Sequence, residues 1–249
     1  MENMNEFNSL GFIAQGGLVS ITVALVLLVM SLASWYLIFV KSYQLVTLRR
    51  AAIKFSEHFW QASSLELALN NQARSNPLSR LASQAVEAAE HHQQHASKRL
   101  ADACNRDEFI ARAMRRTISR ETAKLESGLS VLASVGSVSP FVGLFGTVWG
   151  IYHALASISM SGQATLDKVS GPVGEALIMT ALGLAVAIPA VLAYNALVRG
   201  NRNLLGLLEN FAHDLHILLT TGAPLAAGST SAEEAQPAKV TTHLKEVPA

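Results

Sequence analysis

The sequence predicts an all-α polytopic membrane protein with three transmembrane helices. The chain has 249 residues, half of them hydrophobic, and its formal net charge is +1. The charges are segregated: between residues 127 and 198, only Asp167, Lys168 and Glu175 carry a formal charge. Long uncharged runs of this kind are typical of membrane spans. The balanced charge also argues against nucleic acid as a partner.

The first membrane segment is predicted at residues 16–40. Residues 1–15 before it contain no basic side chain, unlike a secretory signal peptide, and are interpreted as a short tail. The 25 uncharged residues of 16–40 are long enough to cross a hydrocarbon layer of roughly 30 Å. Trp35 and Tyr36, followed by Lys41, indicate an aromatic belt and a basic end. Because this segment lacks a stripe of small residues, we expect it to face the lipid.

Residues 41–127 are predicted to form a helical domain outside the bilayer. They hold 14 basic and 9 acidic residues among many helix formers. Apolar residues recur with helical spacing at Leu65, Leu69, Leu78, Leu81, Ala82, Ala85, Ala88 and Ala89. Asn76-Pro77 is expected to separate two helices. A further helical run, from about Lys98 to Lys124, is predicted to continue directly into the next span.

The rest of the chain supplies two more spans. Residues 128–157 and 172–198 are predicted as the second and third transmembrane helices, joined by a polar connection at 158–171. Residues 199–220 keep a helical apolar pattern, so helices two and three are both expected to extend into the helical domain. Residues 221–249, rich in Ala, Thr, Pro and Glu, are predicted to be disordered.

The distribution of basic residues predicts the orientation. The first 15 residues contain none, and the 158–171 connection contains only Lys168. By contrast, residues 41–127 contain 14 and the chain after residue 198 contains four. Since basic residues collect on the cytoplasmic side, we expect a periplasmic N-terminus, a periplasmic 158–171 loop, a cytoplasmic helical domain and a cytoplasmic C-terminus.

Small residues form a stripe along the second and third spans. In the second span they, with one proline and one threonine, recur at spacings of three and four: Ala133, Gly136, Pro140, Gly143, Thr147, Gly150 and Ala154. The third span repeats this spacing at Ala176, Thr180, Gly183, Ala187 and Ala190. Gly146 and Gly150 also make a G-x-x-x-G pattern. Because hydrophobic drive between helices is weak in lipid, such stripes indicate close helix packing.

Three hydroxyl side chains accompany these stripes. Ser137, Thr147 and Thr180 could each satisfy itself by bonding to a carbonyl of its own helix. They could equally form a partly polar lining, because they lie near one acidic residue. The sequence leaves both interpretations open.

Glu175 is the one acidic side chain predicted inside a span. An ionisable group in hydrocarbon costs about 2.5–3.5 kcal/mol on insertion scales, so it is usually functional. The competing interpretation places Pro172 at the first helical position and Glu175 in the first turn, where an acid is favourable. On an ideal helix Glu175 and Thr180 are about 140° apart and do not share one narrow face.

No pattern for catalysis or metal binding is found. His91, His92 and His95 lack a completing cluster of cysteine or acid, and a solvated helix face explains them. The single cysteine, Cys104, allows no internal disulfide. Catalytic-serine, zinc-protease, phosphate-loop and dinucleotide motifs are absent. The sequence therefore predicts a protein that is not an enzyme and needs no cofactor.

Two blocks of sequence within the predicted spans carry long, specific motifs. Ser137-Val138-Ser139-Pro140, followed by F-V-G-L-F-G-T-V-W-G-I at 141–151, resembles the second-helix signature of the ExbB/TolQ proton-channel family. E-A-L-I-M-T-A-L-G-L-A-V-A-I-P-A-V at 175–191, followed by Tyr194-Asn195, resembles its third-helix signature. One difference is that proline stands three residues before the acid here, whereas the family often has it four before. The 41–127 domain carries no matching motif.

The resemblance implies a multi-pass protein of the bacterial inner membrane that forms a homopentameric ring. The ring would surround the single helices of an ExbD-like partner, and the proton motive force would energise a TonB-like protein for uptake of iron-siderophores or vitamins. Glu175, Thr147 and Thr180 match polar channel positions of the family. An ExbB-like role is favoured over a TolQ-like one that maintains outer-membrane integrity. A structural scaffold and a solute transporter are the remaining alternatives.

Overall fold

The computed structural model describes residues 17–70, 76–95, 106–161 and 166–223, and every regular element within these ranges is a helix. The tails and connections outside them, including the predicted N-terminal and C-terminal tails and Cys104, are not described. The helices are α2 Gly17–Gln61, α3 Leu65–Asn70, α4 Pro77–His95, α5 Arg106–Glu126, α6 Leu129–Ser161 and α7 Leu166–Thr221.

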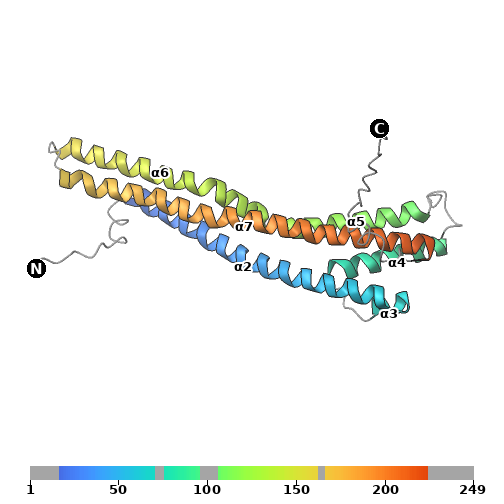
Figure 1. Ribbon diagram of the computed structural model, residues 1–249. Helices are drawn as coiled ribbons and strands as arrows, with labels where there is room; N and C mark the ends of the chain where they lie inside the picture. Colours follow the sequence, from blue (N-terminus) through green and yellow to red (C-terminus); the bar gives the residue numbers. More distant parts are fainter. Residues whose placement is uncertain (1–16, 71–75, 96–105, 162–165, 224–249) are drawn as a thin grey trace, which may run out of the picture.

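The helices form an elongated bundle (Figure 1). At one end α6 and α7 lie side by side and make the most extensive helix contact of the molecule, and α2 packs against both. At the other end the far parts of α2 and α7 pack with α3, α4 and α5. This second region is called the distal bundle below. By length and composition three stretches could cross a membrane: Leu18–Gln61, Arg106–Ala156 and Ala176–Thr221.

The prediction of an all-α protein with three spans is therefore confirmed, but α2 is longer than predicted. It continues without interruption to Gln61, whereas only the second and third spans were expected to extend beyond the bilayer. The physical reason is visible in the sequence, because no glycine or proline follows Gly17 within α2.

The connection between the second and third spans is shorter than the predicted 158–171. Helix α6 continues to Ser161 and α7 begins at Leu166. Pro172 therefore lies inside α7 and not at its first position. A single proline removes one helical hydrogen bond, and a glycine costs about 1 kcal/mol, so neither residue must end a helix.

Helices α5 and α6 are separated by a break at Ser127–Gly128, where direct continuation was predicted. Gly128 has a φ of 82°, a left-handed conformation that glycine adopts without strain. A break of this kind leaves carbonyls at the end of α5 without helical partners. The buried amide of Asn201, from α7, donates to the carbonyl of Leu125 at 3.0 Å. Asn201 thus ties α7 to the end of α5.

The distal bundle contains the largest apolar core. Its buried side chains come from five helices, among them Phe55, Leu81, Ile110, Leu208 and Leu215. The alanines and leucines of α4 that were singled out by helical spacing, from Leu78 to Ala89, are buried as expected. Phe55, Phe59, Trp60 and Phe211 form an aromatic cluster with ring centroids 5.1–5.9 Å apart.

The start of α4 is fixed by Asn76. Its side-chain oxygen accepts a hydrogen bond from the backbone nitrogen of Ser79 at 2.7 Å, and Pro77 takes the first helical position. This is the N-cap arrangement that Asn-Pro favours. The predicted separation of helices at Asn76-Pro77 is therefore correct.

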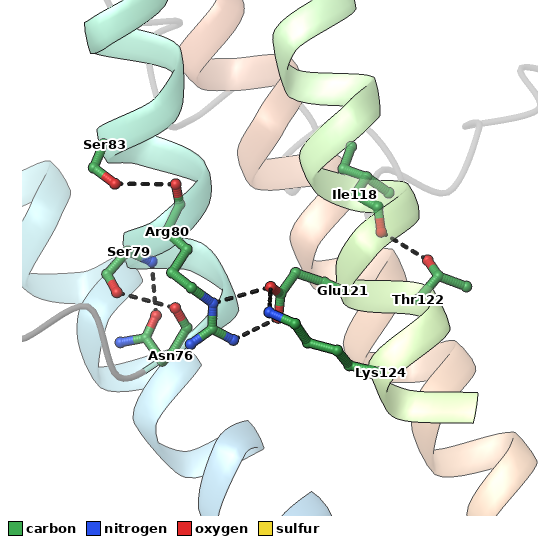
Figure 2. A network of polar contacts seen from close by, with 8 residues as sticks. All are labelled: Asn76, Ser79, Arg80, Ser83, Ile118, Glu121, Thr122 and Lys124. Carbon is green, nitrogen blue, oxygen red and sulfur yellow. Dashed lines mark hydrogen bonds and ion pairs between the residues drawn. The ribbon is translucent and has the colours of Figure 1, made fainter. Parts of the chain in front are cut away.

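A buried carboxylate joins α4 to α5. Figure 2 shows Glu121 of α5 between Arg80 and Lys124. Arg80 Nε donates to Glu121 Oε1 at 3.0 Å, its Nη2 contacts Oε2, and Lys124 Nζ donates to Oε1 at 2.8 Å. The Glu121 side chain is only 4% exposed. Burial alone would raise the pKa of Glu121, but the hydrogen bonds and charges of Arg80 and Lys124 outweigh burial and lower that pKa.

Candidate functional site

The closest approach of α6 and α7 occurs at Gly143 and Gly183. A Cβ added to Gly143 would lie 2.7 Å from the carbonyl oxygen of Met179. A Cβ added to Gly183 would lie 2.7 Å from the carbonyl oxygen of Ser139 and 3.1 Å from the Cα of Gly143. The two backbones therefore touch, and no larger residue fits there without separating the helices.

Other small residues of the predicted stripes lie along the same contact. A Cβ on Gly136 would meet the side chain of Val191, and a Cβ on Gly150 would lie 3.1 Å from the Cβ of Ala176. Gly146 faces Met179 of α7 and Val23 of α2. Ala187 is buried, and Pro140 is half-buried inside α6. Gly146 thus lies where all three membrane helices meet.

Two hydroxyl groups face each other across this contact. The hydroxyl of Thr180 on α7 lies 3.5 Å from that of Thr147 on α6. Thr147, which is buried, donates to the carbonyl of Leu144 at 2.6 Å. The separation of the two hydroxyls is long for a hydrogen bond between such groups, so the Thr180 hydroxyl is held only weakly. The arrangement combines both interpretations of the sequence: Thr147 bonds within its own helix and also faces a second hydroxyl.

The third hydroxyl singled out from sequence, that of Ser137, lies elsewhere. Ser137 is exposed and donates to the carbonyl of Ser134. The buried serine is Ser139, whose hydroxyl donates to the carbonyl of Val135 at 2.7 Å. Sequence reasoning did not select Ser139, although it lies four residues before Gly143 and so on the face that contacts α7.

Glu175 lies well inside α7. The helix begins at Leu166, so Glu175 is nine residues after its first residue, more than two turns into the helix. The interpretation that placed Glu175 in the first turn therefore does not hold. Its neighbour Ala176 is buried against Gly150 of α6. The chain at this level is thus in contact with the second span, while the Glu175 side chain is outside the described part of the structure.

The membrane helices present mostly apolar side chains around this polar pair. Large exposed residues include Phe141, Phe145 and Val148 on α6, and Leu184 and Ile188 on α7. Such surfaces are stable against lipid or against further copies of a membrane helix. In the described residues, the facing hydroxyls of Thr147 and Thr180 form a narrow polar strip between apolar helix surfaces.

His91 and His92 of α4 contact an aromatic ring. In the described ranges, no group of three His, Cys, Asp or Glu side chains is close enough to hold a metal ion. His91 and His92 lie instead against the ring of Phe109, with centroids 6.1 and 5.7 Å apart. His95 is outside the residues whose side chains are described.

The fold and the α6–α7 contact define a class: a multi-pass helical membrane protein with a polar strip at a close helix contact. Comparison with known proteins makes the class specific. Residues 73–210 match the MotA/TolQ/ExbB proton channel family, and the chain belongs to that family. With its three apolar helices, this membership makes it a multi-pass protein of the inner membrane.

Several characterised relatives are similar over most of their length. The biopolymer transport protein ExbB of Xanthomonas campestris is 44% identical over 210 residues, covering 82% of this chain and 83% of its own. The ExbB of Neisseria meningitidis is 40% identical over 205 residues, covering 82% and 93%. The Tol-Pal system protein TolQ of Pseudomonas aeruginosa is 40% identical over 206 residues, covering 80% and 88%.

Proposed function

We propose that the chain is the proton-channel subunit of an ExbB-type motor that uses the proton motive force, together with an ExbD-like single-span partner, to energise a TonB-like protein. The observation that carries the proposal is the pair of facing hydroxyls, Thr147 and Thr180, beside the close contact of α6 and α7 in a chain from a proton-channel family. The similarity to proteins named ExbB supports this role.

In this proposal Glu175, Thr147 and Thr180 form the polar path. Glu175 and Thr180 are five residues apart on α7, about 7.5 Å along the helix axis. Thr180 then meets Thr147 at 3.5 Å. A ring of five such α6–α7 pairs would line a largely apolar pore, in which these groups are the contact points for the partner's acidic residue. The N-terminus would be periplasmic and the distal bundle cytoplasmic.

The membrane potential supplies enough energy for mechanical work. One elementary charge crossing 100 mV is worth about 2.3 kcal/mol, so a few protons could drive rotation or sliding of the partner within the ring. A proton that passes through the membrane needs polar groups nearby, because a charge in hydrocarbon is costly. In this proposal the hydroxyls of the two threonines supply those groups.

Replacing Glu175 tests the proposal. We expect Glu175→Ala and Glu175→Gln to abolish TonB-dependent growth on an iron-siderophore, and Glu175→Asp to retain part of it, because only Asp keeps an ionisable group. Expression and co-purification with the partner should stay normal. Full growth of the Gln variant would remove Glu175 from the proton path and favour a structural scaffold.

A matched pair at Thr147 separates hydroxyl chemistry from packing. Thr147→Ser keeps the hydroxyl, whereas Thr147→Val keeps the shape. If the hydroxyl matters, the Val variant loses activity and the Ser variant keeps it. The opposite result would assign Thr147 to packing alone.

A TolQ-type role is the second candidate, because the Pseudomonas aeruginosa TolQ is 40% identical over a similar length. Deletion of the gene distinguishes the two. Loss of siderophore-dependent growth with an intact envelope supports the ExbB-type role, and detergent sensitivity with normal uptake supports the TolQ-type role.

A further inference from the structure

A stripe of side chains on α2 faces away from the rest of the protein. Helix α2 enters the distal bundle through residues spaced by three and four: Leu45, Leu48, Ala52, Phe55 and Phe59. On its opposite side, residues spaced by four and three are all exposed: Tyr36, Val40, Tyr43, Thr47, Arg50 and Lys54. This second set is called the outer stripe below. Tyr36 and Tyr43 are 67% and 76% exposed, so no described element covers them.

The chemistry of the outer stripe changes in order along the helix. Its first half is aromatic and apolar, Thr47 follows, and Arg50 and Lys54 end it. Neighbouring side chains of α2 make an open, mostly apolar surface along the first half: Phe39, Val40, Tyr43, Gln44, Thr47 and Leu48. Arg50 lies seven residues after Tyr43, about 10 Å further along the axis. This order matches the acyl chain, glycerol region and phosphate of a phospholipid lying along a helix.

The charge of this segment is of one sign. Lys41, Arg49, Arg50 and Lys54 are its cations, and α2 has no acidic residue before Glu57. Clusters of basic residues next to a membrane span attract anionic lipid headgroups. Arginine can also bind a phosphate with two parallel hydrogen bonds, and long basic side chains can reach back to the interface.

We propose that the outer stripe is a binding site for an anionic phospholipid of the leaflet at the Lys41 end of α2. The acyl chain lies on Val40 and Tyr43, and the phosphate contacts Arg50 and Lys54. A soluble phosphate compound would leave the adjoining apolar side chains of α2 unused. A second copy packed through the same stripe would bring like charges together. The site depends only on α2 crossing the membrane, and it stands or falls separately from proton conduction.

Native mass spectrometry of the full-length protein tests the site, with phosphatidylglycerol and phosphatidylcholine of equal chain length added to the detergent. We expect preferential retention of phosphatidylglycerol. Removing a cation should weaken this retention about fivefold for Arg50→Gln and further for Arg50→Gln with Lys54→Gln. The matched control is Arg106→Gln, which removes an exposed cation at the far end of α5 and should change nothing.

Four results would overturn the proposal. Equal retention of both lipids would show that charge plays no part. An equal loss in Arg106→Gln would make the effect one of net charge. Competition by soluble glycerol phosphate as strong as that by phosphatidylglycerol would assign the cations to a soluble anion. A disulfide between copies through Thr47→Cys in native membranes would show that another copy covers the stripe.

Discussion

The α6–α7 contact and the core of the distal bundle are assembled from opposite kinds of residue. In the membrane part, Gly143 of α6 packs against Gly183 of α7, and the two backbones are in contact. In the distal bundle, leucines and a cluster of four aromatic rings fill the space between five helices. The same helix, α7, takes part in both, so the change occurs along one continuous element.

The difference follows from the solvent around each part. In water, burying large apolar side chains is the main driving force, so large residues stabilise the distal bundle. In lipid that drive is weak, and contact between backbones through small residues replaces it. Polar groups differ in the same way: the distal bundle holds a charged network at Glu121, whereas the contact of α6 with α7 brings together two uncharged hydroxyls, 3.5 Å apart.

Enlarging a contact glycine should break the membrane part, with the largest effect of the three changes considered. Gly183→Leu places atoms where the carbonyl of Ser139 lies. A side chain could change rotamer to make room, but the backbone of α6 could move only by separating the two helices. We expect a cost above about 4 kcal/mol and loss of folded protein from size-exclusion chromatography in detergent. Gly206→Leu is the control on the same helix, since nothing lies within 4 Å of that position. Similar behaviour of the two variants would refute the role of close packing.

Removing the guanidinium of Arg80 should damage the distal bundle alone. Glu121 would stay buried without its two-point partner, at a cost of about 2–4 kcal/mol. Hydrogen–deuterium exchange should show lost protection in α4 and α5, with α6 and the membrane part of α7 unchanged. The control is Glu108→Gln, which removes an exposed pair with Arg112 and should change stability by less than about 0.5 kcal/mol.

Acid should weaken the same bundle by a smaller amount. Because the pKa of Glu121 is lowered from its ordinary value of 4.5 in the folded protein, the ionised form stabilises the fold. That contribution is complete above pH 4.5 and is lost as pH falls through the lower, folded pKa. One such group changes the free energy of unfolding by at most about 1.4 kcal/mol per pH unit. Thermal unfolding of Glu121→Gln should therefore depend less on pH below 4.5 than that of the unmodified protein. Equal slopes would contradict the prediction.

Uncharged length was sufficient to predict the three spans, spacing to predict the glycine stripes, and the Asn76-Pro77 pair to predict the separation of helices there. Helical periodicity has limits, however. It could not predict the break at Gly128, because the helical pattern continues on both sides. The residue that bonds to the end of α5, Asn201, lies 73 residues after Gly128 in the sequence. Nor could it predict the Arg80–Glu121 pair, since their separation of 41 residues leaves no local signal. Proline is favoured at the first position of a helix, so the sequence predicts a helix start at Pro172, but α7 begins at Leu166 and continues through that proline.

Helix α7 has a mechanical consequence. Its 56 residues form one helix of about 84 Å that connects the membrane part to the distal bundle. A lever of that length amplifies small motions: a tilt of about 5° at one end displaces the other by about 7 Å. Helices α5 and α6 both pack along α7, and the chain between them is interrupted at Gly128. The protein thus sets one continuous helix beside two helices that meet at a backbone break.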